Sequence, residues 1–305
     1  MNESIKKYMR VGLIHFMAYP SVSSGTGPIE ETLKKIAIDD YFDAVEITWI
    51  KDGKIRKKAK KMIETAHMSV AYSAGPRLMQ QGLNINDLNE DGRVKAVATL
   101  EEGIDEAYEN GCEGFGYLSG RYPKDAIGKE EAYNALVKST MEICEYSKAR
   151  GNLKIALEVF DYDIDKNALI GPASLARRFA KEIRNRYENF GLMVDLSHIP
   201  LIKETIQEAI LPIKDYIIHA HMGNCVLENS NLPGYGDQHP RFGFPDSEND
   251  VNELAEYIKL LMSIGFISEE KRPIVSFEVK PFGDEDPELV IANAKRVLNA
   301  AWAKL

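Results

Sequence analysis

Cysteine is scarce in this sequence of 305 residues, which contains only Cys112, Cys144 and Cys225. The three are widely spaced, odd in number and form no CxxC pair, so a disulfide framework and a thiolate zinc site are both excluded as the basis of the fold. We interpret these cysteines as packing residues of a protein from a reducing compartment.

Long apolar runs and an excess of positive charge are also missing. No stretch approaches the ~18 uninterrupted apolar residues that a membrane-spanning helix needs, and the first segment, MNESIKKYMR, lacks the apolar stretch of a secretion signal. The 38 Lys and Arg are outnumbered by 47 Asp and Glu, for a formal net charge of -9. We therefore expect a cytoplasmic protein that binds neither membrane nor nucleic acid.

What the sequence contains is a regular alternation of short apolar segments and longer amphipathic segments. The apolar segments predict eight strands, at residues 9–16, 42–50, 67–74, 112–120, 154–161, 192–198, 216–222 and 273–279. The amphipathic segments predict helices at 29–40, 54–66, 93–110, 129–151, 172–190, 200–210, 248–265 and 286–305. Eight strand–helix units without a linker favour one (β/α)8 TIM barrel domain over residues 1–305. The competing doubly wound sheet would place a glycine fingerprint after the first strand, which SSGTGP does not match.

Charged residues stand where four consecutive predicted strands end, namely Glu158, Asp195, His221 and Glu278. Active sites of (β/α)8 barrels lie at the carboxyl ends of the strands, so we expect these side chains to share one rim. Three carboxylates and one imidazole suit a divalent cation, and the oxygen-rich set favours the harder ions. We predict a site for one divalent cation, with Mn²⁺ as the first expectation and Mg²⁺, Co²⁺ or Zn²⁺ as alternatives.

His219 precedes His221 by two residues, and residues two apart in a strand point to the same side. We interpret His219 either as a substrate contact or as a residue that supports His221 through a hydrogen bond.

The segments LEVFD, VDLSHIP, HAHMGN and SFEVKP carry a family resemblance. They resemble the sugar isomerase/epimerase superfamily with xylose isomerase-like barrels, which includes ketose 3-epimerases and hydroxypyruvate isomerases. The resemblance implies that Glu158, Asp195, His221 and Glu278 bind the metal. It also implies that Glu158 and Glu278 transfer protons on opposite sides of a bound sugar, and that His198 contacts this substrate in the catalytic site.

The implied chemistry is proton abstraction next to the carbonyl group of a sugar or keto-sugar. A divalent cation can stabilise the resulting enediolate as a Lewis acid. One carboxylate can take the proton and a second can return it at another face or carbon, which gives an isomerase or epimerase.

At one position the sequence departs from the ketose 3-epimerases, which place a substrate-binding Arg six residues after the ligand His. Here that position is Leu227. The long loop YGDQHPRFG that follows supplies Asp237, His239 and Arg241, and we expect His239 and Arg241 to contact substrate. We interpret this loop as a substrate lid, with a subunit contact as the alternative.

The same loop and the segment LIHFMAYP resemble the larger (alpha) subunit of bacterial C-glycoside deglycosidases. This resemblance implies a lyase that cleaves 3-oxo-C-glycosides with the same base and metal, in complex with a small β-rich subunit. We therefore expect an isomerase or epimerase, with the lyase as the alternative. The corresponding assemblies are a homo-oligomer or a hetero-oligomer with such a subunit.

Several residues near the ends of other predicted strands are further candidates for the substrate pocket, namely His15, Glu46, Trp49 and Arg121. Each could equally be a packing residue of the core or rim. Endonuclease IV shares this barrel, but its trinuclear zinc centre needs more ligands than the six His provide, and the acidic charge opposes a DNA partner. A barrel that serves only as a binding module would be expected to lack some of the four metal ligands.

Overall fold

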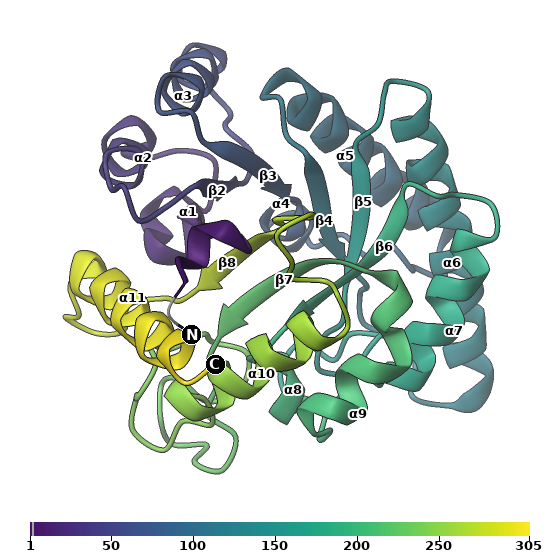
Figure 1. Cartoon of the computed structure of the whole chain (residues 1–305). Coiled ribbons are helices and arrows are strands. Elements are labelled where there is room, and N and C mark those ends of the chain that lie inside the picture. Colours follow the sequence, from purple (N-terminus) through teal and green to yellow (C-terminus); the bar gives the residue numbers. More distant parts are fainter. Residues whose placement is uncertain (2) are drawn as a thin grey trace.

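The computed structural model describes residue 1 and residues 3–305, and its strands close into a parallel barrel. The strands pair in chain order: β1 (Arg10–Ile14), β2 (Ala44–Ile47), β3 (Ser69–Ser73), β4 (Gly114–Leu118), β5 (Lys154–Glu158), β6 (Phe190–Asp195), β7 (Ile217–Gly223) and β8 (Ile274–Glu278). β8 returns to β1, with Val11 paired to Val275. The predicted (β/α)8 TIM barrel is confirmed (Figure 1).

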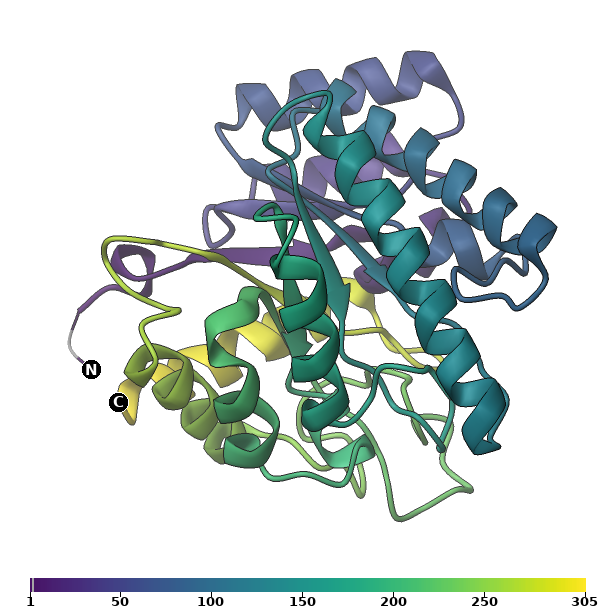
Figure 2. The same ribbon diagram turned by 90° about the vertical axis from the view of Figure 1, so that its right-hand side faces the viewer.

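Helices surround the barrel, and the two chain termini lie side by side (Figures 1 and 2). The longer helices are α2 (Ile29–Ala37), α3 (Gly53–Thr65), α5 (Glu90–Glu109), α6 (Ala126–Lys148), α7 (Ala173–Arg184), α10 (Val251–Ser263) and α11 (Pro287–Ala303). The shorter ones are α1 (His15–Ala18), α4 (Gly75–Met79), α8 (His198–Leu201) and α9 (Ile206–Ile210), with 3₁₀ turns η1 (Ile5–Lys7), η2 (Pro20–Val22) and η3 (Leu211–Tyr216). No helix in the described part of the chain is long and apolar enough to cross a membrane.

The helices pack on the barrel through apolar faces that follow the helical period. In α7, Ala176, Phe179, Ala180 and Ile183 are buried while the Lys and Arg residues between them face outward. The Phe179 ring meets Phe190, the first residue of β6, edge to face at a centroid distance of 5.8 Å. Such contacts fix the strand ends, and therefore the rim on which the predicted site lies.

Two predicted boundaries near the site are wrong in the same way, because a short helix begins directly after the strand or two residues further on. β1 ends at Ile14, so His15 opens α1 instead of closing the first strand. β6 ends at Asp195, and His198 is the first residue of α8. The predicted helix 200–210 is interrupted because Lys203 has a φ of 61°, a left-handed conformation that an α-helix cannot contain.

Candidate metal centre

Four side chains meet at the carboxyl ends of β5 to β8. Glu158, Asp195 and Glu278 are the last residues of their strands, and His221 lies two residues before the end of β7. Asp195 pairs directly with His221, whereas Glu158 pairs with Met193 and Glu278 with Gly223, so the four residues are staggered by no more than two positions between neighbouring strands. One donor atom from each of the four lies within 4.8 Å of the others. The residues that the sequence placed on one rim therefore lie together.

The four side chains are buried, with exposed fractions between 1% and 8%. Within the described residues, three of their atoms have no hydrogen-bond partner: Glu158 Oε1, His221 Nδ1 and Glu278 Oε2. His221 Nδ1 lies 2.8 Å from Glu278 Oε2 and 3.4 Å from Glu158 Oε1. Buried polar atoms are normally hydrogen-bonded, so converging lone pairs of this kind fit a divalent cation held mainly by oxygen ligands.

The electrostatic surroundings of His221 also favour a bound cation. Burial alone would lower the pKa of this ring, but the carboxylates of Glu46, Glu158 and Glu278 outweigh it and raise the pKa well above its ordinary value. The surrounding carboxylates therefore stabilise a positive charge at the ring. Either a proton or a metal ion at Nδ1 can provide this charge.

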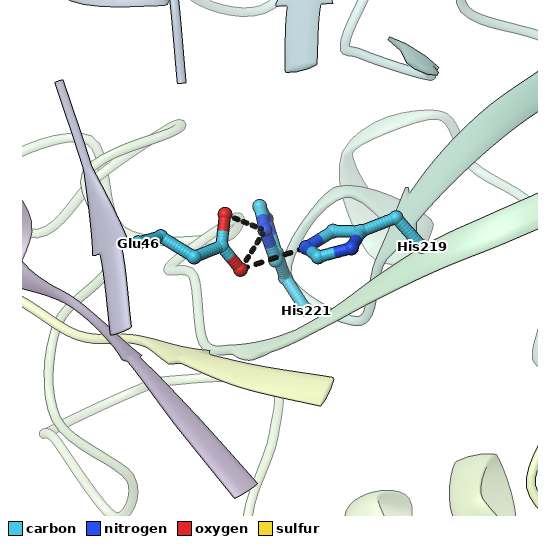
Figure 3. Close-up of side chains that lie close together, drawn as sticks. All are labelled: Glu46, His219 and His221. Atoms are coloured by element: carbon cyan, nitrogen blue, oxygen red, sulfur yellow. Dashed lines mark hydrogen bonds and ion pairs between the residues drawn. The ribbon is translucent and has the colours of Figure 1, made fainter. Parts of the chain in front are cut away.

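Glu46 of β2 contacts the other nitrogen of the same ring. Its Oε1 and Oε2 lie 3.2 and 3.3 Å from His221 Nε2, and its Oε1 lies 2.7 Å from His219 Nε2 (Figure 3). The two imidazoles, which come from one face of β7, stand at an interplanar angle of 89° with centroids 5.1 Å apart. Burial opposes ionisation of Glu46, but the two histidines outweigh it and hold the pKa of this carboxyl well below its ordinary value.

The loop between β7 and α10, drawn in green at one end of the barrel in Figure 2, brings Asp237 and His239 to the centre. Asp237 Oδ1 lies 2.9 Å from His198 Nε2 and 2.7 Å from His239 Nε2, while its Oδ2 lies 2.8 Å from Lys166 Nζ. Burial would raise the pKa of Asp237, but these three neighbours together lower it well below its ordinary value. The backbone N–H of Lys280 donates to the His239 carbonyl at 2.7 Å and ties the loop to β8.

His198 is fully engaged by the protein. Its Nδ1 lies 2.9 Å from the carbonyl oxygen of Val159, and its Nε2 faces Asp237. Because both partners only accept hydrogen bonds, both ring nitrogens carry protons and the ring is positively charged. Burial lowers the pKa of His198, but Asp237 and Asp195 outweigh it and raise it to about 10.

A cavity of about 200 Å³ opens beside the four carboxyl-end residues. Glu158, Glu278, His239 and Lys280 give it a polar side. Its apolar side is formed by Phe16, Met17, Pro76, Met79, Leu118 and Phe160. A small polar molecule with one apolar face would fit these surroundings.

A larger cavity of about 480 Å³ lies at the opposite end of the barrel. It is lined by residues that open their strands, among them Arg10, Gly114 and Lys154. Glu46 and His219 also line it. The Glu46 carboxylate therefore stands between this cavity and His221.

Two predicted pocket residues of the first half of the chain lie outside this centre. His15 Nε2 is hydrogen-bonded to Thr32 Oγ1 at 2.7 Å, because His15 opens α1 and faces α2. The indole N–H of Trp49 donates to the Ser23 carbonyl at 3.1 Å. The structure thus gives both side chains protein partners away from the four ligand candidates.

Two predicted arginines also bind elsewhere in the protein. Arg241 Nε donates to Glu285 at 2.8 Å, and its Nη1 donates to the Gly243 carbonyl at 2.9 Å. Arg121 Nε donates to the Lys166 carbonyl at 3.3 Å. The loop therefore contributes its Asp237 and His239 to the centre and turns Arg241 away.

Ser197 and Lys166 belong to the centre but were not among the predicted residues. Ser197 donates its backbone N–H and its hydroxyl to the two oxygens of Asp195, at 2.8 and 2.7 Å. A Ser two residues after a strand-end Asp is a local turn signal that could have found it. Lys166 lies in the loop after β5, and no sequence pattern marks it.

Comparison with known proteins identifies the class to which this barrel belongs. The family model described as "Xylose isomerase-like TIM barrel" matches residues 37–300. The chain belongs to this family, which confirms the resemblance carried by its strand-end motifs. A search of curated proteins found no match.

Among solved structures, the chain is similar to D-psicose 3-epimerase with D-tagatose from Clostridium cellulolyticum H10, with 20% identity, coverage of 97% and 99% of the two chains and a TM-score of 0.70. It is similar to L-ribulose 3-epimerase at 18% identity, 97% and 96% coverage and a TM-score of 0.72. It is also similar to 3-keto-D-glucoside 4-epimerase from E. coli, at 16% identity, 97% and 99% coverage and a TM-score of 0.64. At these identities the likeness establishes the shared fold.

Proposed function

We propose that this protein is a divalent-metal-dependent isomerase or epimerase that acts on a keto-sugar by abstracting the proton next to its carbonyl group. In this proposal Glu158, Asp195, His221 and Glu278 hold the cation, and Mn²⁺ is the first ion to test. The observation that supports it most directly is the set of buried carboxylate and imidazole atoms that converge without hydrogen-bond partners in the described chain.

A bound divalent cation would supply Lewis acidity toward the oxygens of the substrate. The proton transfers belong to the two glutamates that line the 200 Å³ cavity, Glu158 on β5 and Glu278 on β8. One carboxylate removes the proton from the carbon next to the carbonyl, and the other returns a proton from its own side of the substrate. His239, which lines this cavity, would then contact the substrate once it enters, whereas the charged His198, whose two nitrogens are held by Val159 and Asp237, would position Asp237 and act through it.

Solvent deuterium exchange tests this function. The protein is incubated in D2O with Mn²⁺ and each of a set of keto-sugars, including psicose, tagatose, ribulose and a 3-keto-glucoside. We expect deuterium at the carbon next to the carbonyl, together with an isomer or epimer of the sugar. Absence of label from every sugar, with Mn²⁺, Mg²⁺, Co²⁺ or Zn²⁺ supplied in turn, would overturn the proposal.

The Glu158→Gln variant tests the assignment of the base. General acid–base catalysis contributes roughly 10²–10⁴-fold to a rate, so we expect deuterium exchange to fall by at least about 100-fold. The folded state should persist, because the amide is isosteric and Glu158 Oε1 accepts no hydrogen bond among the described residues. Glu106→Gln is the matched control, since Glu106 is a buried glutamate that pairs with Arg77 and lies outside the centre. Full exchange in Glu158→Gln would remove Glu158 as the base.

The lyase reaction on a 3-oxo-C-glycoside remains a second candidate, and two observations favour it. The loop that follows β7 inserts Asp237 and His239 beside the four ligand candidates, and the neighbouring cavity has an apolar side suited to an aromatic aglycone. Proton abstraction next to the 3-oxo group would then be followed by loss of the aglycone. Release of free aglycone, with or without an added small β-rich subunit, would favour this reaction over isomerisation.

A further inference from the structure

Glu46 has a feature that distinguishes it from the other carboxylates around His221. It is 2% exposed and comes from β2, which pairs with β1 and β3 and with none of the strands that carry the four ligand candidates. It contacts only the Nε2 edge of the ring, whereas Glu158 and Glu278 lie at the Nδ1 edge. The two ring nitrogens therefore face different carboxylates, and only those at Nδ1 belong to the four ligand candidates.

We infer that Glu46 is a positioning residue that orients His221 for the metal, and that it is not a substrate contact. A carboxylate only accepts hydrogen bonds, so at this position the Nε2 of His221 must carry the hydrogen. The lone pair of the neutral ring is then at Nδ1, the atom that faces Glu158 and Glu278. This inference rests on the proposed role of His221 as a metal ligand.

His219 completes the arrangement from the same strand. Its Nε2 donates to Glu46 Oε1 at 2.7 Å, closer than either contact with His221, so both rings contact the same carboxylate (Figure 3). A carboxylate that accepts from a ligand histidine fixes the tautomer and orientation of the ring and raises its basicity as a ligand. In the HxH pair of β7, His221 is thus the metal ligand, and His219 holds the Glu46 carboxylate that orients it.

The location of Glu46 excludes direct contact with a substrate in the 200 Å³ cavity. Glu46 and His219 line the 480 Å³ cavity at the other end of the barrel, and neither lines the cavity beside Glu158 and Glu278. A substrate in the smaller cavity would therefore meet the metal-facing side of His221, while Glu46 acts through the opposite edge of the ring.

Metal titration of the full-length protein tests the inference. We expect Glu46→Leu, which removes the acceptor, to weaken Mn²⁺ binding by roughly 10–100-fold in calorimetry, the effect typical of such supporting residues. Glu46→Gln keeps an amide oxygen that can still accept, so its affinity should fall less. The control Glu106→Gln changes another buried glutamate, one that pairs with Arg77, and it should bind Mn²⁺ like the wild type.

A spectroscopic readout separates positioning from a general effect on folding. In protein with ¹⁵N-labelled histidine rings and Mg²⁺, the His221 Nε2–H signal, assigned by its loss in His221→Asn, should be protected from solvent exchange. This protection should be lost in Glu46→Leu at unchanged circular dichroism. Wild-type affinity together with a protected signal in Glu46→Leu would overturn the inference. A wild-type protein that binds none of the divalent cations would overturn the metal centre and this inference together, so the two failures can be told apart.

Discussion

The six histidines of this chain lie in contrasting surroundings, and those surroundings assign them different chemistry. His198 and His239 lie among carboxylates that outweigh the effect of burial, and their pKa values rise to about 10 and about 9. His15 is equally buried but has a hydroxyl as its hydrogen-bond partner, so burial lowers its pKa to about 4. The direction of the pKa shift thus distinguishes a charged histidine of the centre from a neutral histidine of the core.

Replacement of His15 should change how stability depends on pH. The pKa of His15 is lower in the folded state, at about 4, than the ~6.5 of an unfolded chain. The unfolded state therefore binds a proton first as the pH falls, and the stability contribution of the neutral ring, present above pH ~6.5, is lost between about pH 6.5 and 4. This loss amounts to about 3 kcal/mol at ~1.36 kcal/mol per pKa unit.

Urea unfolding at pH 7 and at pH 4.5 measures the effect. We expect the stability advantage of the wild type over His15→Gln to shrink on acidification. His67→Gln serves as the control for the same replacement at an exposed position. Identical pH dependence of the wild type and His15→Gln would contradict a neutral buried ring.

At the scale of the elements, the strand ends were predictable and the contacts between distant strands were not. Glu158, Asp195 and Glu278 each stand where an apolar strand meets polar sequence, and this local pattern identifies a barrel rim. The contact of Glu46 with His221 joins residues 175 positions apart. It depends on closure of the barrel, which no local pattern reveals, so from the sequence alone Glu46 is only a candidate for the substrate pocket.

The direction of side chains after a strand end does not follow from the local sequence either. Arg241 and His239 lie in one loop, yet Glu285 draws the guanidinium away while Asp237 holds the imidazole at the centre. His15 was predicted at the end of a strand, but the short helix α1 begins at that residue and turns the ring toward Thr32. Such turns of one or two residues depend on partners elsewhere in the fold, which a local pattern does not contain.

Two glycines in the barrel strands should respond to the same substitution in opposite ways. A Cβ at Gly114, the first residue of β4, would meet no atom within 4 Å and would point into open space of the 480 Å³ cavity. A Cβ at Gly191 in β6 would lie 2.6 Å from Ile218 Cγ2 and 2.7 Å from the Tyr216 carbonyl oxygen. Gly114→Ala should therefore stabilise the protein by about 0.5–1 kcal/mol, because it restricts the unfolded chain without a clash.

Gly191→Ala should destabilise it by about 1–3 kcal/mol, since the strand must shift to admit the methyl group. Thermal and urea unfolding of both variants beside the wild type provide the comparison. The prediction for β4 fails if Gly114→Ala is as destabilised as Gly191→Ala, which would mean that the space at the amino end of the barrel is filled.

At the scale of the whole molecule, the barrel is stabilised unevenly along its axis. Much of its interior is apolar, but the carboxyl end concentrates the buried charges of Glu158, Asp195, Asp237 and Glu278. Nearby carboxylates repel one another in a buried environment, and positive charge from histidine, lysine or a cation is needed to offset this repulsion. The stability of the fold and the occupancy of the centre should therefore be linked.

Metal binding should raise the melting temperature of the protein for this reason. A ligand that binds only the folded state at 100 times its dissociation constant adds about 2.7 kcal/mol to the free energy of unfolding, which corresponds to roughly 5 °C for a domain of this size. We expect Mn²⁺ to produce this shift in a thermal scan and EDTA to reverse it. Asp195→Asn should abolish the response, because it weakens one of the four ligands, whereas Glu106→Gln should retain it. An equal response to Mn²⁺ in Asp195→Asn would locate the bound ion elsewhere, because Asp195 is one of the four residues whose donor atoms lie within 4.8 Å of one another.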